Sequence, residues 1–193
     1  MESKITKCIS SSVENYNNIL NDQDLQANIK KIIMLTVNAL KDDKKILFCG
    51  NGGSASDAQH IAAELSGRFY VNRPPLYAEA LHVNSSYITA VANDFGYDET
   101  YARMLEACGR QGDVLFGIST SGNSNNVVKA LNKANEIGLK TIGLTGSHGG
   151  DMNSICDIMI KVPSDDTPRI QEAHILIGHI ICQIIEEEMF PDA

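Results

Sequence analysis

One design occurs twice in this chain and does most to limit the folds it can adopt: an apolar run that ends in a loop of small residues, followed at once by a helical pattern. The first copy is LFCGNGGSAS at residues 47–56, and the second is VLFGISTSGNS at residues 114–124. Glycine lets a ligand approach the backbone, and a helix N-terminus offers free N–H groups with a partial positive charge. Two such loops predict a phosphorylated small molecule held between them.

The remaining pattern alternates helices and strands. Helices are expected at residues 3–20, 23–42, 54–66, 85–92, 98–109, 125–137 and 170–189. Strands are expected at residues 45–49, 77–83, 114–118, 140–144 and 158–162. Strands separated by helices predict an α/β fold with a parallel sheet covered on both faces. Both small-residue loops would then lie at the carboxyl ends of strands, where such sheets bind ligands.

The composition limits which partners the chain can bind and in which compartment it is expected to act. With 193 residues, 43% hydrophobic and 21% charged, the chain has the makeup of a single globular domain. A net charge of −8 argues against nucleic acid as a partner. The five cysteines are scattered and never form C-x-x-C, which is typical of reduced thiols in a cytoplasmic protein. The N-terminus lacks a signal-peptide pattern, and polar residues interrupt the apolar stretch at residues 170–189, so no membrane span is expected.

Two common nucleotide loops do not account for the pattern. Neither loop contains Gly-Lys-Ser or Gly-Lys-Thr, which excludes a Walker A motif. Gly50, Gly52 and Ala55 fit the G-x-G-x-x-A dinucleotide fingerprint, but that motif needs an acidic residue at the end of the next strand. The next expected strand ends near His82 without one, so a dinucleotide site is not expected.

Further motifs carry a family resemblance. They are HIAAELSGRF at residues 60–69, ANDFG at 92–96, LTG at 144–146 and RIQEAH at 169–174. Together with the two loops they make residues 45 to 190 resemble the SIS (sugar isomerase) domain family, and within it the isomerases of sedoheptulose 7-phosphate. The resemblance implies a flavodoxin-like three-layer sandwich with a five-stranded parallel sheet, preceded by N-terminal helices.

The resemblance also implies an organisation, an activity and a cofactor. Residues 1–193 would form a single SIS domain that binds neither nucleic acid nor membrane, and it would act in the cytoplasm as a homotetramer. Residues 1–42 form an apolar helical pair with no obvious place on a five-stranded core, so we expect this pair to pack between subunits. The implied reaction is the aldose–ketose isomerisation of sedoheptulose 7-phosphate to D-glycero-D-manno-heptose 7-phosphate. That product would supply heptose to lipopolysaccharide, capsule or another surface glycan, and each subunit would hold one zinc ion.

The implied zinc ligands are His60, Glu64, Gln171 and His179. His60 and Glu64 are four residues apart and share a helix face, which suits two metal ligands, an acid–base pair or an ordinary exposed pair. Gln171 and His179 are eight residues apart, about 12 Å along a helix and offset by about 80°, so their spacing alone does not indicate a metal. His174 and His148 are interpreted as structural, and the role of His82 is left open.

The implied catalytic residues are Glu64 and His179. Isomerisation needs a base that moves a proton between C1 and C2, for which Glu64 is the candidate, and a carrier of hydroxyl protons, for which His179 is the candidate. A carboxylate bound to zinc is a weaker base, so either Glu64 detaches during turnover or the metal mainly orders the site. The residues that match substrate-binding positions are Asn51, Gly52, Gly53, Glu64, Asn93, Asp94, Ser119, Thr120, Ser121, Ser124 and Gln171. Helix capping by the serines and a simple turn at residues 93–96 are compatible with binding.

Two alternative functions remain open, and one stretch of the chain departs from the family pattern. Some SIS proteins, such as the DnaA-associating replication regulator, bind phosphosugars without known chemistry, and their tail resembles residues 189–192. They lack residues corresponding to Glu64 and His179, which favours an enzyme here. An isomerase of another sugar phosphate, such as a pentose, would have the same loops. The chain departs from its relatives at residues 165–168, where Pro168 precedes Arg169, so no substrate contact is assigned there.

Overall fold

The computed structural model describes residues 1–192 and contains an α/β domain with a parallel sheet. Its helices are α1 (Glu2–Asn21), α2 (Gln23–Lys41), α3 (Gly53–Ser66), α4 (Ser85–Phe95), α5 (Thr100–Cys108), α6 (Asn125–Glu136) and α7 (Thr167–Met189), with short 3-10 helices η1 (Tyr97–Glu99) and η2 (Gly150–Ser154). Its strands are β1 (Ile46–Gly50), β2 (Ala78–Ala80), β3 (Val114–Ile118), β4 (Lys140–Thr145) and β5 (Ile158–Lys161). The predicted elements are confirmed, with ends that differ by a few residues.

The order of the strands explains where a ligand can sit. The sheet runs β2-β1-β3-β4-β5 and every neighbouring pair is parallel, with Phe48 of β1 in register with Ala80 of β2 and Phe116 of β3. This is the flavodoxin-like order, in which the chain moves outward from β1 in one direction and then from β3 in the other. The crevice at this reversal lies beyond the carboxyl ends of β1 and β3, and the two small-residue loops begin there.

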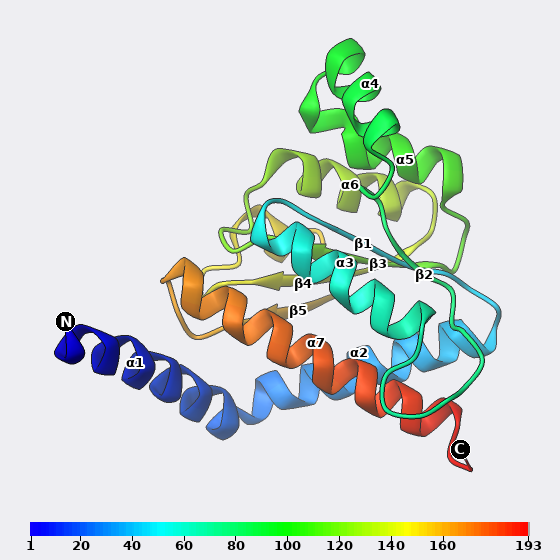
Figure 1. Ribbon diagram of the computed structural model, residues 1–193. Helices are drawn as coiled ribbons and strands as arrows, with labels where there is room; N and C mark the ends of the chain where they lie inside the picture. The colour runs from blue at the N-terminus through cyan, green and yellow to red at the C-terminus, as the bar shows by residue number, and fades with distance from the viewer. Residues whose placement is uncertain (193) are drawn as a thin grey trace.

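Helices cover both faces of the sheet, which confirms the predicted three-layer sandwich (Figure 1). Side chains alternate along each strand, so Phe48 and Phe116 pack toward α2, α3 and α7, and their rings stack with centroids 4.8 Å apart. Leu47 and Leu115 point to the opposite face and pack against α5 and α6. The central strands β1 and β3 are buried along their whole length, as expected for a parallel sheet.

The two N-terminal helices differ in how they meet this core. The expectation that their apolar stripe lacks a place on a single subunit is wrong for α2, because Ile29, Ile32 and Val37 are buried against α7 and β5. Asp22 caps α2 by accepting a hydrogen bond from the N–H of Leu25 at 2.9 Å. Helix α1 extends away from the sheet at the edge of the molecule (Figure 1), and most of its apolar side chains are exposed.

Helix α7 begins earlier than the hydrophobic pattern predicts. It starts at Thr167 and not at Ile170, because Pro168 occupies its first turn, where the missing N–H costs nothing and the fixed φ suits a helix. The start is therefore set by a residue that sequence patterns usually treat as a helix breaker. Over residues 1–192, no helix combines the length and the apolar character needed to cross a membrane.

Candidate functional site

The first loop joins β1 to α3 and brings the backbone into tight contact. A Cβ atom at Gly50 would lie 2.6 Å from the carbonyl oxygen of Ser54, so a larger residue does not fit. The Tyr101 hydroxyl donates a hydrogen bond of 2.5 Å to the Gly50 carbonyl and anchors the end of the strand. Gly52 has φ of 55° and precedes α3, with open space around it. The N-terminus of α3 is therefore exposed to a ligand at this loop.

Asn51 in this loop is fixed by a residue that the sequence analysis did not single out. Its amide exchanges two hydrogen bonds with the buried Asn126 amide, at 2.8 and 2.9 Å, and its Oδ1 accepts a further bond of 3.2 Å from the Tyr97 hydroxyl. Asn126 lies in the first turn of α6, so the pair ties the first loop to the helix that follows the second. No spacing rule links positions so far apart in the chain, which is why sequence reasoning missed it.

The second loop joins β3 to α6 and gathers hydroxyl groups. The Ser119 hydroxyl is buried and lies 2.9 Å from the Ser124 hydroxyl and 3.4 Å from the Ser121 hydroxyl. Gly122 has φ of 69°, and a Cβ atom there would lie 2.1 Å from the Gly149 carbonyl oxygen, so glycine is required. The loop therefore holds three hydroxyls beside the N-terminus of α6, an arrangement suited to phosphate.

A pocket of about 180 Å³ opens beside this loop. Its lining includes Thr120, Ser121, Gly146, Ser147, His148 and Asp165. The Thr120 carbonyl accepts a hydrogen bond of 2.9 Å from the Gly146 N–H, which ties the second loop to the end of β4. Asp165, from the stretch that departs from the family pattern, accepts a hydrogen bond from the Ser147 hydroxyl.

Asn93 and Asp94 lie at the C-terminal end of α4 and are exposed. The Asn93 amide donates a hydrogen bond of 2.8 Å to the Asp94 carboxylate. They directly precede the segment that carries Tyr97, whose hydroxyl reaches Asn51. The structure thus brings this segment toward the first loop through Tyr97, and a substrate contact of Asn93 and Asp94 themselves stays a prediction.

The packing of α3 against α7 places Gln171 and His179 at different points along one helix–helix contact. A Cβ atom at Gly53 would lie 2.5 Å from Nε2 of Gln171, and one at Gly178 would lie 2.5 Å from Cδ1 of Ile61. The two helices therefore run side by side in the same direction, and the small residues let them approach closely. Gln171 meets the first turn of α3, whereas His179 meets the middle of that helix.

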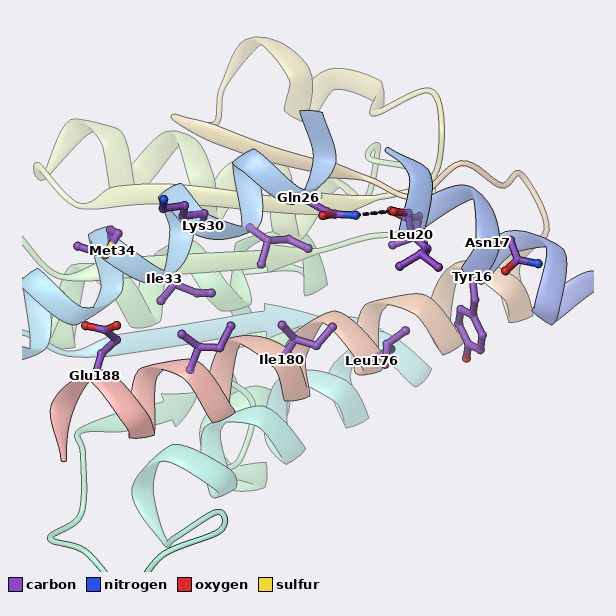
Figure 2. Close-up of a pocket in the computed structure, with 13 residues that line it drawn as sticks. Tyr16, Asn17, Leu20, Gln26, Lys30, Ile33, Met34, Leu176, Ile180 and Glu188 are labelled. Atoms are coloured by element: carbon purple, nitrogen blue, oxygen red, sulfur yellow. Dashed lines mark hydrogen bonds between the residues drawn. The ribbon is translucent and has the colours of Figure 1, made fainter. Parts of the chain in front are cut away.

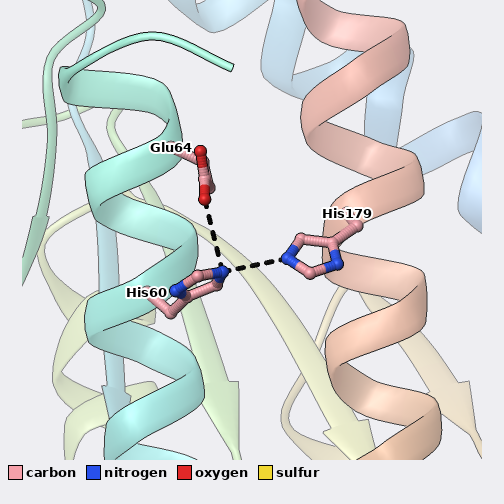
Figure 3. Close-up of side chains that lie close together, drawn as sticks. All are labelled: His60, Glu64 and His179. Carbon is pink, nitrogen blue, oxygen red and sulfur yellow. Dashed lines mark hydrogen bonds and ion pairs between the residues drawn. The ribbon is translucent and has the colours of Figure 1, made fainter. Parts of the chain in front are cut away.

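Three side chains converge between these helices (Figure 3). His60 and Glu64 extend from α3, and His179 extends toward them from α7. The two histidine Nε2 atoms are 2.9 Å apart, and His60 Nε2 is 3.3 Å from Glu64 Oε1. One potential ligand atom from each residue lies within 4.8 Å of the others. His60 is half exposed and Glu64 is partly exposed, so solutes can reach the group.

The donor set fits zinc. Imidazole nitrogen and carboxylate oxygen bind zinc at about 2.0–2.2 Å, and neighbouring ligands of a tetrahedral zinc are about 3.3 Å apart. The observed separations of 2.9 Å between the imidazole nitrogens and 3.3 Å from His60 to Glu64 are close to this spacing. Three protein ligands also leave a fourth position for another group, as in catalytic zinc sites. The predicted fourth ligand, Gln171, lies nearer the first loop and stays a prediction.

The remaining histidines lie in three different environments. His174 is fully buried with Nε2 3.2 Å from the Thr145 carbonyl, and burial lowers the pKa of His174 to about 4, as fits a structural histidine. His148 is exposed, 3.5 Å from the Asp165 carboxylate, and so does not pack in the core. Burial also lowers the pKa of His82, whose ring lies 6.5 Å from that of Tyr101.

The segment after α3 supplies further residues near the group. The Phe69 ring stacks on the His179 ring at 5.7 Å, and Arg73 and Glu186 form a buried ion pair of 2.8 Å behind it. The sequence analysis assigned no role to any of the three. Arg73 precedes two prolines and Glu186 stands in an acidic run, and neither context indicates burial.

Comparison with known proteins places the chain in a family. The SIS domain family matches residues 12–146. The phosphoheptose isomerase of Clostridium acetobutylicum is 50% identical over 190 residues, covering 98% of this chain and 97% of its own. The phosphoheptose isomerase of Sulfurimonas denitrificans is 48% identical over 192 residues, covering 100% of this chain and 98% of its own.

Solved structures give the same assignment. Phosphoheptose isomerase GmhA from Neisseria gonorrhoeae superposes with a TM-score of 0.91 at 39% identity, covering 96% of this chain and 98% of its own. A phosphoheptose isomerase from Francisella tularensis gives a TM-score of 0.92 at 37% identity, covering 96% of this chain and 97% of its own. Relatives of this identity and coverage share more than a fold. The chain belongs to the SIS domain family and, within it, to the phosphoheptose isomerases.

Proposed function

We propose that this chain converts sedoheptulose 7-phosphate to D-glycero-D-manno-heptose 7-phosphate by aldose–ketose isomerisation. The observation that carries the proposal is the group of His60, Glu64 and His179. It lies on α3, which starts at the first loop, and on α7, which packs against the start of α3. A carboxylate and imidazoles are the groups that isomerisation needs, and the loops suit the phosphate end of the sugar.

The phosphate end of the substrate is held by the second loop. Hydroxyls of Ser119, Ser121 and Ser124 and backbone N–H groups at the start of α6 donate to phosphate oxygens. Because the chain carries a net charge of −8, these local donors and the helix N-terminus provide the attraction for the anion. The other proposed contacts come from Asn51, Gly52, Gly53, Asn93, Asp94, Thr120 and Gln171.

The reacting end lies between α3 and α7. Glu64 takes a proton from one of C1 and C2, exchanges it with solvent and delivers a proton to the other carbon, so the substrate passes through an enediolate. His179 moves protons on and off the hydroxyl oxygens. His60 lies beside it, with the two Nε2 atoms 2.9 Å apart. Both proposed catalytic groups are partly open to solvent, as substrate entry requires.

We also propose that the group holds one zinc ion per chain, with His60, Glu64 and His179 as ligands and Gln171 as the fourth. When bound, zinc would supply a Lewis acid that polarises the substrate carbonyl. The protein residues supply the proton transfers. With ligands on both α3 and α7, the metal would also link the two helices, and this ordering of the site would be separate from its chemical role.

The assembly proposed for this chain is a homotetramer that uses residues 1–42. A groove of about 820 Å³ runs between α2 and α7 and ends at α1, and apolar side chains from all three helices line it (Figure 2). Leu20 at its end is 70% exposed, and Ile9 elsewhere on α1 is 60% exposed. Exposed apolar surface of this extent favours contact with another protein surface, and a second copy of the chain is the occupant that the family resemblance implies.

A cytoplasmic location and a role in surface-glycan synthesis complete the proposal. All five cysteines are free thiols, which is typical of a reducing compartment. The heptose phosphate product suits the supply of heptose to a surface glycan.

A panel of sugar phosphates tests the proposed reaction. Purified protein is incubated with sedoheptulose 7-phosphate, ribulose 5-phosphate and fructose 6-phosphate, and aldose formation is followed by NMR. We expect turnover of the seven-carbon substrate at least about tenfold above the others in kcat/KM, equivalent to about 1.4 kcal/mol of discrimination. Preference for a pentose would move the proposal to another sugar phosphate, and binding without turnover would favour a phosphosugar-binding regulator.

A further inference from the structure

The Glu186 carboxylate lies buried on α7 and binds the segment that follows α3. Its side chain is 3% exposed. Its two oxygens accept hydrogen bonds from three consecutive backbone N–H groups, those of Phe69 at 3.0 Å, Tyr70 at 2.7 Å and Val71 at 3.0 Å. Burial acts to raise the pKa of Glu186, but these donors and Arg73 outweigh it and the pKa is lowered, so the carboxylate is ionised. Glu186 therefore binds the backbone of residues 69–71 from the interior of the fold, and we call this contact the backbone clamp.

Arg73 connects the same carboxylate to α3. Its side chain is fully buried, and its Nε donates a hydrogen bond of 2.8 Å to Glu186. The Nη2 group donates at 2.8 Å to the backbone carbonyl of Glu64, and Nη1 donates at 2.8 Å to that of Leu65. These carbonyls belong to the last turn of α3, which has no intrahelical donors for them. Arg73 therefore caps α3 at the residue that carries the proposed base.

The clamp also reaches His179. Glu186 follows His179 by about two helical turns, so the two side chains lie on the same face of α7. The segment that Glu186 binds carries Phe69, whose ring stacks on the imidazole of His179 with an interplanar angle of 28°. One buried ion pair is thus connected to both catalytic side chains, to Glu64 through its own carbonyl and to His179 through Phe69.

We infer that Arg73 and Glu186 are positioning residues that set the placement of Glu64 relative to His179, an inference that rests on the proposed function. Their hydrogen bonds go to each other and to backbone groups, and not to the side chain of Glu64 or His179. A buried ion pair is weak evidence for a purely stabilising role, because apolar side chains of similar size often stabilise as well. Apolar side chains cannot bind the carbonyls of α3 and the N–H groups of the next segment at once. The pair therefore specifies geometry between the two helices.

The test uses conservative substitutions in the full-length protein. Arg73→Lys keeps the charge but loses the fork that binds two carbonyls and the carboxylate together, and Glu186→Gln keeps the size but loses one acceptor. We expect kcat and zinc affinity each to fall by about 10–100-fold, the range seen when groups behind metal ligands are changed. KM should stay within about twofold, because the second loop that holds the phosphate is elsewhere. The double variant should lose little more than either single variant, since the two residues act as a unit.

Two matched controls separate positioning from general stability. Arg110→Lys removes another guanidinium that caps a helix, because Nη1 of Arg110 donates to the carbonyls of Ala107 and Gly109 at the end of α5. Glu187→Gln alters the exposed neighbour of Glu186 on α7. Both controls should keep the parental kcat and zinc affinity, even where the melting temperature falls. Parental kcat and zinc affinity in folded Arg73→Lys and Glu186→Gln would overturn the inference.

The inference can be tested apart from the proposed function. If the parent protein does not isomerise sugar phosphates, the proposed function fails, but the imidazole NMR signals of His179 in metal-free protein still report its contact with Phe69. We expect those signals to shift in Arg73→Lys and Glu186→Gln and to stay in place in the controls. If the two variants do not fold, Phe69→Leu, which leaves the ion pair intact, should lower zinc affinity several-fold. Unchanged zinc affinity in Phe69→Leu would then contradict the inference.

Discussion

At the scale of single residues, the serine hydroxyls of the second loop are proposed to bind the phosphate, whereas Glu64 and His179 are proposed to carry out the chemistry. Ser121 is exposed, and its Oγ accepts a hydrogen bond of 3.1 Å from the Asn123 N–H. We expect Ser121→Ala to raise KM about 5- to 30-fold with kcat within about threefold, because the lost contact is to the phosphate that does not react. Steady-state kinetics of the purified variant checks this. An unchanged KM with a large fall in kcat would place Ser121 at the reacting end.

His174 makes stability depend on pH. The folded protein keeps this histidine neutral until its pKa of about 4, whereas the unfolded chain takes up the proton near 6.5. The unfolded state therefore binds more protons between these values, and stability falls as pH is lowered from 6.5 to 4, by up to about 3 kcal/mol from this group. His174→Gln should flatten the slope of the free energy of unfolding in this range, measured by urea denaturation at each pH.

The carboxyl of Asp57 affects the stability of the fold in the opposite sense. Burial raises the pKa of Asp57 to about 6. The stability that this group contributes at low pH is therefore lost as the pH rises toward 6. Comparing the slopes of parent and variant isolates the effect of His174. His148→Gln is the matched control, because His148 is exposed, and it should keep the parental slope. A parental slope in His174→Gln would exclude His174 as the source.

At the scale of elements, the site depends on how closely α7 approaches α3. Gly178 lies at the contact beside His179, and a Cβ atom there would lie 2.5 and 2.8 Å from side-chain atoms of the buried Ile61. We expect Gly178→Ala to move the helices apart, to destabilise the fold by about 1–3 kcal/mol and to weaken zinc binding. Calorimetric titration of zinc and thermal unfolding with and without zinc measure both effects.

In the parent, zinc at 100 times its Kd should stabilise the fold by about 2.7 kcal/mol, and His60→Ala should remove most of that gain. Zinc binding of parental strength in Gly178→Ala would show that the close approach of the helices is not needed for the metal. If the parent itself shows no zinc-dependent stabilisation, the three side chains act as acid, base and polar contacts only.

Elements and their order are the part of this structure that sequence patterns predict well. Apolar runs and loop glycines locate β1, β3 and both loops to within a residue or so, because these signals are local. The start of α7 was missed because Pro168 can open a helix as well as end one. The packing of α2 on its own subunit was missed because an apolar stripe does not reveal which surface covers it.

The candidate site was predicted only where residues share a helix or a family motif. His60 and Glu64 share a helix face, and their proximity follows from spacing. The approach of His179 to His60 depends on parallel packing of α3 and α7, which no local signal specifies. The pairing of Asn51 with Asn126 joins residues 75 apart, and the Arg73–Glu186 pair joins residues 113 apart, so both follow from tertiary structure alone.

At the scale of the whole molecule, the exposed apolar surface of α1 and the groove between α2 and α7 predict association. We expect light scattering at micromolar concentration to give four times the mass of one chain. Leu20→Asp should shift this mass downward, because a charge would replace a side chain that is 70% exposed at the end of the groove. Lys30→Gln, a polar change at the same groove, is the control. A single-chain mass for the parent protein would contradict the assembly.

The account as a whole depends on Glu64 acting as a base in an isomerase, and solvent-deuterium exchange measures this directly. In D₂O, the parent should convert sedoheptulose 7-phosphate to the aldose with deuterium incorporated at C2, followed by NMR. Glu64→Gln keeps the size of the side chain but removes the base, so both product and deuterium should fall by at least about 10³-fold while the fold is retained. Glu187→Gln should match the parent. Near-parental turnover by Glu64→Gln would contradict the account.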